Sequence, residues 1–132
     1  MQITRQADYA VRAVYHLSKL EPGERAATSQ IAKAQQIPPS FLAKIVSQLS
    51  VAGLLQTSRG ARGGVSLARS PEEISLLEVI EAIDGPMMDH LPLAEQTGNA
   101  PFSLKMEDVC RKATQEIKAV YQKSTLSAML GA

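Results

Sequence analysis

The amino-acid sequence predicts a mainly α-helical fold, and both composition and periodicity favour that class. Apolar residues make up 45% of the 132 residues, whereas aromatic residues make up 4% and Trp is absent. A core built from Leu, Ile, Val, Ala and Met favours helix packing over a β-sandwich, whose strands prefer aromatic and β-branched side chains. Apolar residues recur at helical spacing along the chain, and only residues 54–58 and 65–68 have the character of short strands.

Two helices are expected in the first third of the chain. Apolar residues at helical spacing over residues 7–20 predict the first helix, with Thr4 as its candidate N-cap and Pro22 beyond its end. Thr28 and Ser29 are expected to cap a short second helix, because their hydroxyl groups can accept hydrogen bonds from the first backbone amides.

A third helix is expected over residues 41–52, after a break at residues 37–40, with Gly53 in a left-handed C-terminal cap. One face of this helix is apolar and carries Leu42, Ile45, Val46 and Leu49. The opposite face is polar and carries Ser40, Lys44, Ser47 and Gln48. A DNA-recognition helix needs this division, although an ordinary amphipathic surface helix shares it.

The two short strands enclose a glycine-rich, basic hairpin tip at residues 59–64. Arg59 and Arg62 supply charge, and the glycines, Gly60 among them, let the backbone approach a phosphate or enter a minor groove. The tip lacks the Gly-Lys-Ser/Thr ending of a nucleotide-binding loop and does not lead into a helix. Three helices followed by a basic hairpin are the order of a winged helix-turn-helix domain, which binds duplex DNA.

Charge is distributed unevenly along the chain, whose net charge is +1. Residues 1–70 hold nine Lys and Arg against three Asp and Glu, whereas residues 71–132 hold five against ten. A basic half suits a surface that binds a polyanion, although chance clustering would give the same count.

The C-terminal part predicts two further helices. Ser75 and Glu78 form a capping-box pattern ahead of the fourth helix, and an apolar stripe marks the fifth. The stripe carries Met106, Val109, Cys110, Ala113, Ile117, Val120 and Tyr121. We therefore expect a winged helix-turn-helix domain at residues 1–84, a sensor loop at residues 85–105, and a dimerisation helix with a C-terminal tail at residues 106–132.

At this point the sequence resembles the Rrf family of bacterial winged-helix transcription regulators, whose members include IscR, NsrR and CymR. The resemblance covers nearly the whole chain and rests on several short motifs in order. They are Asp8-Tyr9-Ala10-Val11 within residues 4–11, Ile31-Ala32, Ile37-Pro38, residues 42–49, residues 52–55, the 59–64 tip, residues 78–85, Cys110 and residues 125–127.

The resemblance implies a homodimer paired through the long fifth helix, with a recognition helix in the major groove and a wing in the adjacent minor groove. The predicted DNA-binding residues are Thr28, Ser29, Ser40, Phe41, Lys44, Gln48, Arg59, Gly60 and Arg62. The predicted dimer residues are Val109, Ala113, Ile117, Val120 and Tyr121. A two-fold dimer places two recognition helices about one DNA turn apart, so we expect an imperfect palindrome as operator. Ala43 stands where some members carry an acidic base-reading residue.

Many family members hold an iron–sulfur cluster with three cysteines in the loop before the last helix. Here Cys110 matches the last of the three and is the single Cys of the sequence. Ala94 and Ala100 have spacing similar to the first two, so they are either replaced ligands of a cluster-binding parent or native to a cluster-free member. With alanine at positions 94 and 100, the chain is expected to hold no cofactor, because one thiolate cannot hold such a cluster.

The leading hypothesis is a sequence-specific, dimeric transcription regulator related to iron–sulfur or redox sensors. The alternatives are a cluster-free regulator controlled by a metabolite or partner protein, and a protein-interaction module with a vestigial wing. An enzyme is not expected, because His16 and His90 belong to no nucleophile constellation. The sequence shows neither an 18-residue apolar run nor a secretory signal, so we expect no membrane contact and a cytoplasmic protein.

Overall fold

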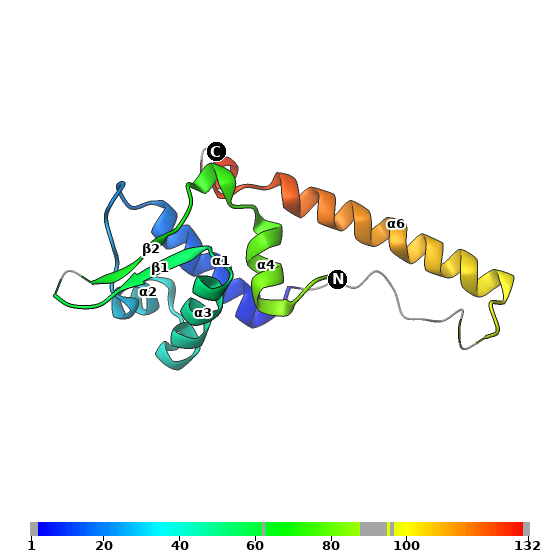
Figure 1. Ribbon diagram of the computed structural model, residues 1–132, viewed down its shortest axis with the longest axis horizontal. Coiled ribbons are helices and arrows are strands. Elements are labelled where there is room, and N and C mark those ends of the chain that lie inside the picture. Colours follow the sequence, from blue (N-terminus) through cyan, green and yellow to red (C-terminus); the bar gives the residue numbers. More distant parts are fainter. Residues whose placement is uncertain (1–2, 62, 88–94, 96, 131–132) are drawn as a thin grey trace.

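The computed structural model describes residues 3–61, 63–87, 95 and 97–130. In chain order the elements are α1 (Arg5–Ser18), α2 (Thr28–Gln35), α3 (Pro39–Val51), β1 (Leu55–Ser58), β2 (Gly64–Leu67), the 3-10 helix η1 (Pro71–Glu73), α4 (Leu76–Asp84), α6 (Pro101–Lys123) and α7 (Leu126–Leu130). Helices α1 to α4 and the hairpin form one body, from which α6 extends away (Figure 1). The predicted mainly α-helical, winged helix-turn-helix fold is confirmed.

The core lies where α1, α3 and α4 meet, with α2 packed on α1 and α3. Its fully buried large side chains come from every part of the body and include Val14, Ile31, Leu42, Ile45, Leu49, Leu54, Ile74 and Val79. The predicted N-cap of α1 is confirmed, because Thr4 Oγ1 accepts a 3.1 Å hydrogen bond from the Ala7 amide. Gly53 has the predicted left-handed conformation, with φ +80°, at the end of α3.

The start of α2 differs from the prediction that Thr28 and Ser29 cap it. Ala27 is the N-cap, and Thr28 is already the first helical residue. The Ala27 side chain has no acceptor, but the Gln30 side chain reaches back and accepts a 2.9 Å hydrogen bond from the Ala27 amide. A glutamine at the third helical position therefore supplies the capping contact that we assigned to a hydroxyl.

The wing is an antiparallel pair in which Leu55 lies opposite Leu67 and Ser58 opposite Gly64. The linker before α2 adds one further pairing, because Ala26 and Val65 exchange backbone hydrogen bonds of 3.0 and 2.8 Å. Gly64 has a φ of +146°, and a Cβ atom there would lie 2.8 Å from the Ala26 carbonyl oxygen. A glycine is therefore required where the wing meets the body.

The C-terminal boundaries also differ from the expectation. Helix α6 begins at Pro101, so residues 101–105 are helical rather than part of the sensor loop, because proline suits the first helical position. The expected tail contains α7, whose Leu126 is 1% exposed. The Leu126 amide donates to the Ile74 carbonyl at 3.0 Å, which returns the end of the chain to the body. Within the described ranges, no helix is both long and apolar enough to cross a bilayer.

Candidate nucleic-acid interface

The outward face of α3 is the centre of the candidate interface. The four residues predicted to face inward are buried, with Leu42 and Leu49 at most 1% exposed. The opposite face is exposed at Ser40, Ala43 and Lys44 in the first two turns and at Ser47 in the next. Small side chains and one cation thus cover the half of the helix that a major groove could receive, while Gln48 lies half-buried at its margin.

The start of α3 is supported by α1. Phe41 is 44% exposed, and its ring centroid lies 6.1 Å from that of Tyr9 at an interplanar angle of 50°. This tilted aromatic contact is a favourable geometry for two π systems. Phe41 was predicted only as a DNA contact. In the structure it also packs the N-terminal turn of α3 against α1.

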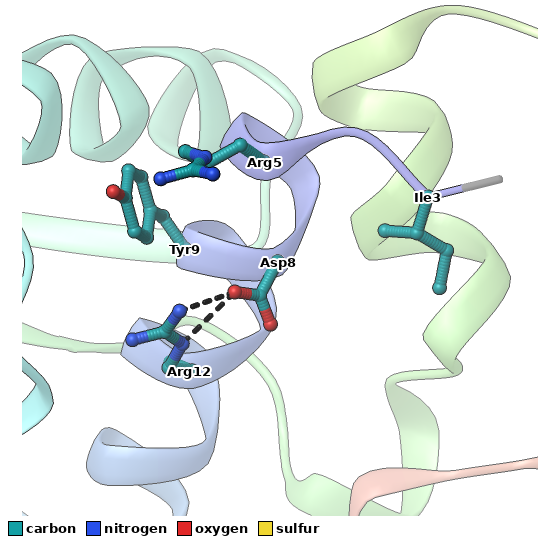
Figure 2. A pocket seen from close by; sticks show the side chains of 5 residues that line it. All are labelled: Ile3, Arg5, Asp8, Tyr9 and Arg12. Carbon is teal, nitrogen blue, oxygen red and sulfur yellow. Dashed lines mark hydrogen bonds and ion pairs between the residues drawn. The ribbon is translucent and has the colours of Figure 1, made fainter.

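A cluster of α1 side chains surrounds the Tyr9 ring (Figure 2). The Arg12 guanidinium lies 5.1 Å from the ring centroid and pairs with Asp8 one turn earlier. The hydrogen bond with the Asp8 carboxylate raises the pKa of Arg12 above its ordinary value. Arg5, Asp8, Tyr9 and Arg12 line one shallow pocket with Ile3, and Figure 2 shows Arg5 beside the same ring.

Arg12 also holds α2. Its Nη1 donates a 2.9 Å hydrogen bond to the carbonyl of Gln35, the last residue of that helix. This carbonyl has no partner within the helix, so an external donor satisfies it. The following residue, Gln36, has a left-handed φ of 55° in the turn between α2 and α3. Arg12 thereby joins α1 to the turn of the helix-turn-helix.

The remaining predicted DNA contacts lie on either side of α3. Thr28 and Ser29 are exposed at the start of α2, and Arg59 and Gly60 are exposed at the wing tip. Arg62 lies outside the described residues. A hollow of about 340 Å³ lies between the start of α2 and the wing, lined by Thr28, Ser58 and Gly60 among others. The described residues of the predicted set thus come from three elements of one body.

Three residues near these elements were missed by sequence reasoning. Arg5 is an exposed cation at the start of α1, and Lys33 is an exposed cation on α2. Tyr9 is the third, because its ring contacts that of Phe41. Arg5, Tyr9 and Arg12 recur at helical spacing, which is the signal that could have found them. Lys33 lines a groove between α2 and α3 that no sequence pattern reveals, because it depends on the turn geometry.

Helix α6 carries an exposed apolar face. Residues 102, 106, 109, 113 and 120 recur at spacings of three, four and seven, which is typical of a coiled-coil seam. All five are exposed, and Phe102, Val109 and Val120 are 77%, 65% and 63% exposed. The other two predicted dimer residues, Ile117 and Tyr121, are half-buried on the neighbouring side of the helix.

The residues offered to a metal were tested against an iron–sulfur cluster. Cys110 is half-buried on α6, Ala100 is the α6 N-cap, and Ala94 lies outside the described residues. In the described part of the chain, no group of three or more His, Cys, Asp or Glu could hold a metal ion. Since the whole sequence has a single thiol, its donor set does not fit a cysteine-ligated cluster.

Comparisons with known proteins agree with this geometry. The profile of the Rrf2 family, described as an iron-dependent transcriptional regulator, matches residues 3–132. The chain is 34% identical over 134 residues to a candidate HTH-type transcriptional regulator, Rv1287, of Mycobacterium tuberculosis strain H37Rv, covering 99% of this chain and 82% of that protein. It is 34% identical over 111 residues to the HTH-type transcriptional regulator NsrR of Geobacillus kaustophilus, covering 84% and 73%.

Solved structures share the fold. T. potens IscR superposes with a TM-score of 0.75 at 24% identity, covering 99% of this chain and 87% of that chain. The oxidized form of Staphylococcus aureus CymR gives a TM-score of 0.69 at 26% identity, covering 98% and 95%. The chain therefore belongs to the Rrf2 family of helix-turn-helix transcriptional regulators and is a DNA-binding regulator of that family.

Proposed function

We propose that the chain binds an imperfect palindrome as a homodimer, with α3 in the major groove and the wing in the adjacent minor groove. The observation that carries this proposal is the exposed face of α3, on which Ser40, Lys44 and Ser47 stand opposite a fully buried face. Hydroxyl and ammonium groups at this spacing can donate to base edges and phosphates. We expect DNA binding to take place in the cytoplasm, where a bacterial regulator has access to its operator.

The wing supplies the second contact in this proposal. Arg59 is exposed on a tip whose hairpin is held to the body by the Ala26–Val65 pairing. A guanidinium beside glycine can enter a narrow minor groove, where the negative potential is strongest. Thr28 and Ser29 are exposed at the start of α2, and in this proposal their hydroxyl groups donate to phosphate oxygens.

The exposed seam of α6 supports the dimer. A helix that presents Phe102, Val109 and Val120 to solvent would leave a contiguous apolar strip on a monomer. Pairing two such helices around a two-fold axis buries the strip and sets the distance between two copies of α3. The wing and α3 of each copy would then read one half-site.

In this proposal the regulator responds to its signal without a bound iron–sulfur cluster. With one thiol in the sequence, the chain fits a cluster-free regulator that responds to a metabolite or a partner protein. Reconstitution with iron and sulfide should leave the protein colourless, and a visible cluster spectrum would overturn this part of the proposal. The double variant Ala94→Cys, Ala100→Cys should be coloured after the same treatment only if those alanines replaced native ligands.

The DNA-binding proposal is tested with gel shifts on a selected operator and on random duplexes. Lys44→Ala should lose discrimination between the two, by about 1–3 kcal/mol if Lys44 reads a base. Arg62→Ala should weaken both duplexes equally if Arg62 holds a phosphate, and Arg59→Ala should weaken operator binding through the minor groove. Lys118→Ala, on α6, is the matched control. Unchanged affinity in Lys44→Ala and both wing variants would contradict the assignment.

A further inference from the structure

A groove of about 360 Å³ lies between α2 and α3 beside the proposed recognition face. Its apolar lining residues are Ala32, Ile37, Pro39, Leu42 and Ala43. Its α2 side carries Thr28, Ser29 and Lys33. Ile37 and Leu42 are buried core residues, whereas Pro39 and Ala43 are exposed.

The charged residues in and beside the groove suit a polyanion. Lys33 lies on the α2 side and Lys44 follows Ala43 on α3, and both side chains are exposed. Lys33 lines the groove and Lys44 is the neighbour of Ala43, so positive charge lies near an apolar surface. This combination suits a duplex, whose phosphates border its base edges. An apolar partner peptide would leave these two cations without complementary charge, so the charges favour DNA as the occupant.

The chemistry of the exposed lining residue Ala43 limits which base can face it. Ala43 offers neither a hydrogen-bond donor nor an acceptor, so a polar base atom placed against it would lose its water without replacement. In the major groove, the C5-methyl group of thymine is the one apolar group that the base pairs present. Contact between this methyl group and the Ala43 side chain removes apolar surface of both from water.

We propose that the groove between α2 and α3 receives the C5-methyl group of a thymine, so that Ala43 specifies an A·T pair in each half-site. This inference rests on the proposed function, because it requires α3 to lie in the major groove. It assigns specificity to a position without a polar side chain. Lys44 and Ser40 remain the proposed hydrogen-bonding readers beside it.

The experiment begins with selection of tightly bound duplexes from a random pool, followed by replacement of each thymidine in turn with deoxyuridine. The replacement removes one methyl group and keeps every hydrogen-bonding atom of the base. One position in each half-site should lose affinity about fourfold, the value expected for one buried methyl group, and the others should change less than twofold.

Two variants assign the effect to the groove. In Ala43→Ser, the hydroxyl group should remove most of the difference between thymidine and deoxyuridine at that position. Ala52→Ser, at the exposed C-cap of the same helix, should keep the fourfold difference. Circular dichroism and thermal unfolding establish that both variants fold.

The outcomes separate the two proposals. A pool that yields no enriched sequence overturns the proposed function and this inference with it. An enriched operator that tolerates deoxyuridine everywhere, or whose half-sites lack thymine, overturns the inference alone. A deoxyuridine effect that persists unchanged in Ala43→Ser also overturns it, since the methyl group then contacts another part of the protein.

Discussion

The guanidinium of Arg12 donates a 2.9 Å hydrogen bond to the carbonyl of Gln35, across 23 residues of sequence. The bond satisfies the carbonyl of the last residue of α2, next to the turn that leads into α3. The same guanidinium pairs with Asp8 and lies over the Tyr9 ring, which contacts Phe41 at the start of α3. One α1 side chain therefore contributes to the position of both helices of the helix-turn-helix.

Replacing Arg12 should loosen this arrangement. Arg12→Met keeps an apolar stem against Tyr9 but leaves the Gln35 carbonyl without its donor. The free energy of unfolding should fall by about 1 kcal/mol, below the usual range for a charged hydrogen bond because over a third of the side chain is exposed. Urea denaturation measures the change. Arg5→Met, on the same helix, is the control, and an equal loss in both variants would contradict the role given to Arg12.

Gly64 should tolerate no side chain. Gly64→Ala forces a positive φ on alanine and places its Cβ against the Ala26 carbonyl oxygen, so the wing must move away from the body. Gly23→Ala is the matched control, since Gly23 also has a positive φ, of +85°, but open space around it. The control should lose about 1 kcal/mol of stability, and Gly64→Ala should lose more and bind DNA more weakly. Similar losses in the two variants would exclude the steric reason.

Local signals predicted most of the fold. Helical spacing and the hairpin tip gave the element order, because each depends on residues close in sequence. The start of α6 was misplaced although Pro101 marked it, since the same proline was read as a loop residue. The cap of α2 was misplaced because a glutamine replaced the usual hydroxyl.

Contacts between distant residues could not be predicted. Three such contacts depend on how the elements pack. They are the pairing of Leu126 with Ile74, the Arg12–Gln35 hydrogen bond, and the groove lined by Ala43. Sequence periodicity describes one element at a time and carries no information on these distances. The polar face of α3 was predicted because it lies within a single helix, whereas its support by Tyr9 was not.

The α6 seam should hold the dimer together. Val109→Asp places a charge in the centre of the exposed apolar face, so the dimer should dissociate at micromolar concentration. Gln115→Asp, which is exposed on the opposite side of the helix, should leave it intact. Sedimentation velocity distinguishes the two. A wild-type monomer, or a Val109→Asp dimer as stable as the control, would refute pairing through this face.

Asp108 should titrate below the ordinary aspartate range. Lys112 Nζ lies 2.9 Å from its carboxylate, and the hydrogen bond with Lys112 lowers the pKa of Asp108, with a further contribution from the Lys112 charge. A lowered folded-state pKa means that the pair stabilises α6 at neutral pH and that this contribution disappears as the pH falls through that pKa. Carboxyl NMR should detect the shift and its reversal in Lys112→Gln. An unchanged titration in that variant would contradict the pairing.

Arg5 should strengthen binding to every duplex alike. It is exposed at the start of α1 and lies beside the Tyr9 ring (Figure 2). The Tyr9 ring in turn contacts Phe41 at the start of α3. A guanidinium there can reach a phosphate next to the major groove, and phosphate contacts carry no sequence information.

Arg5→Gln should therefore weaken operator and random duplexes by the same factor. It should also reduce the slope of log affinity against log salt by about 0.9 for each copy of Arg5 in the complex, the value for one phosphate contact. Fluorescence anisotropy at several salt concentrations measures both quantities. Lys123→Gln removes an equal charge from the C-terminal end of α6 and should leave the slope unchanged. A loss confined to the operator would mean that Arg5 reads a base, and an unchanged slope would place Arg5 away from the phosphates.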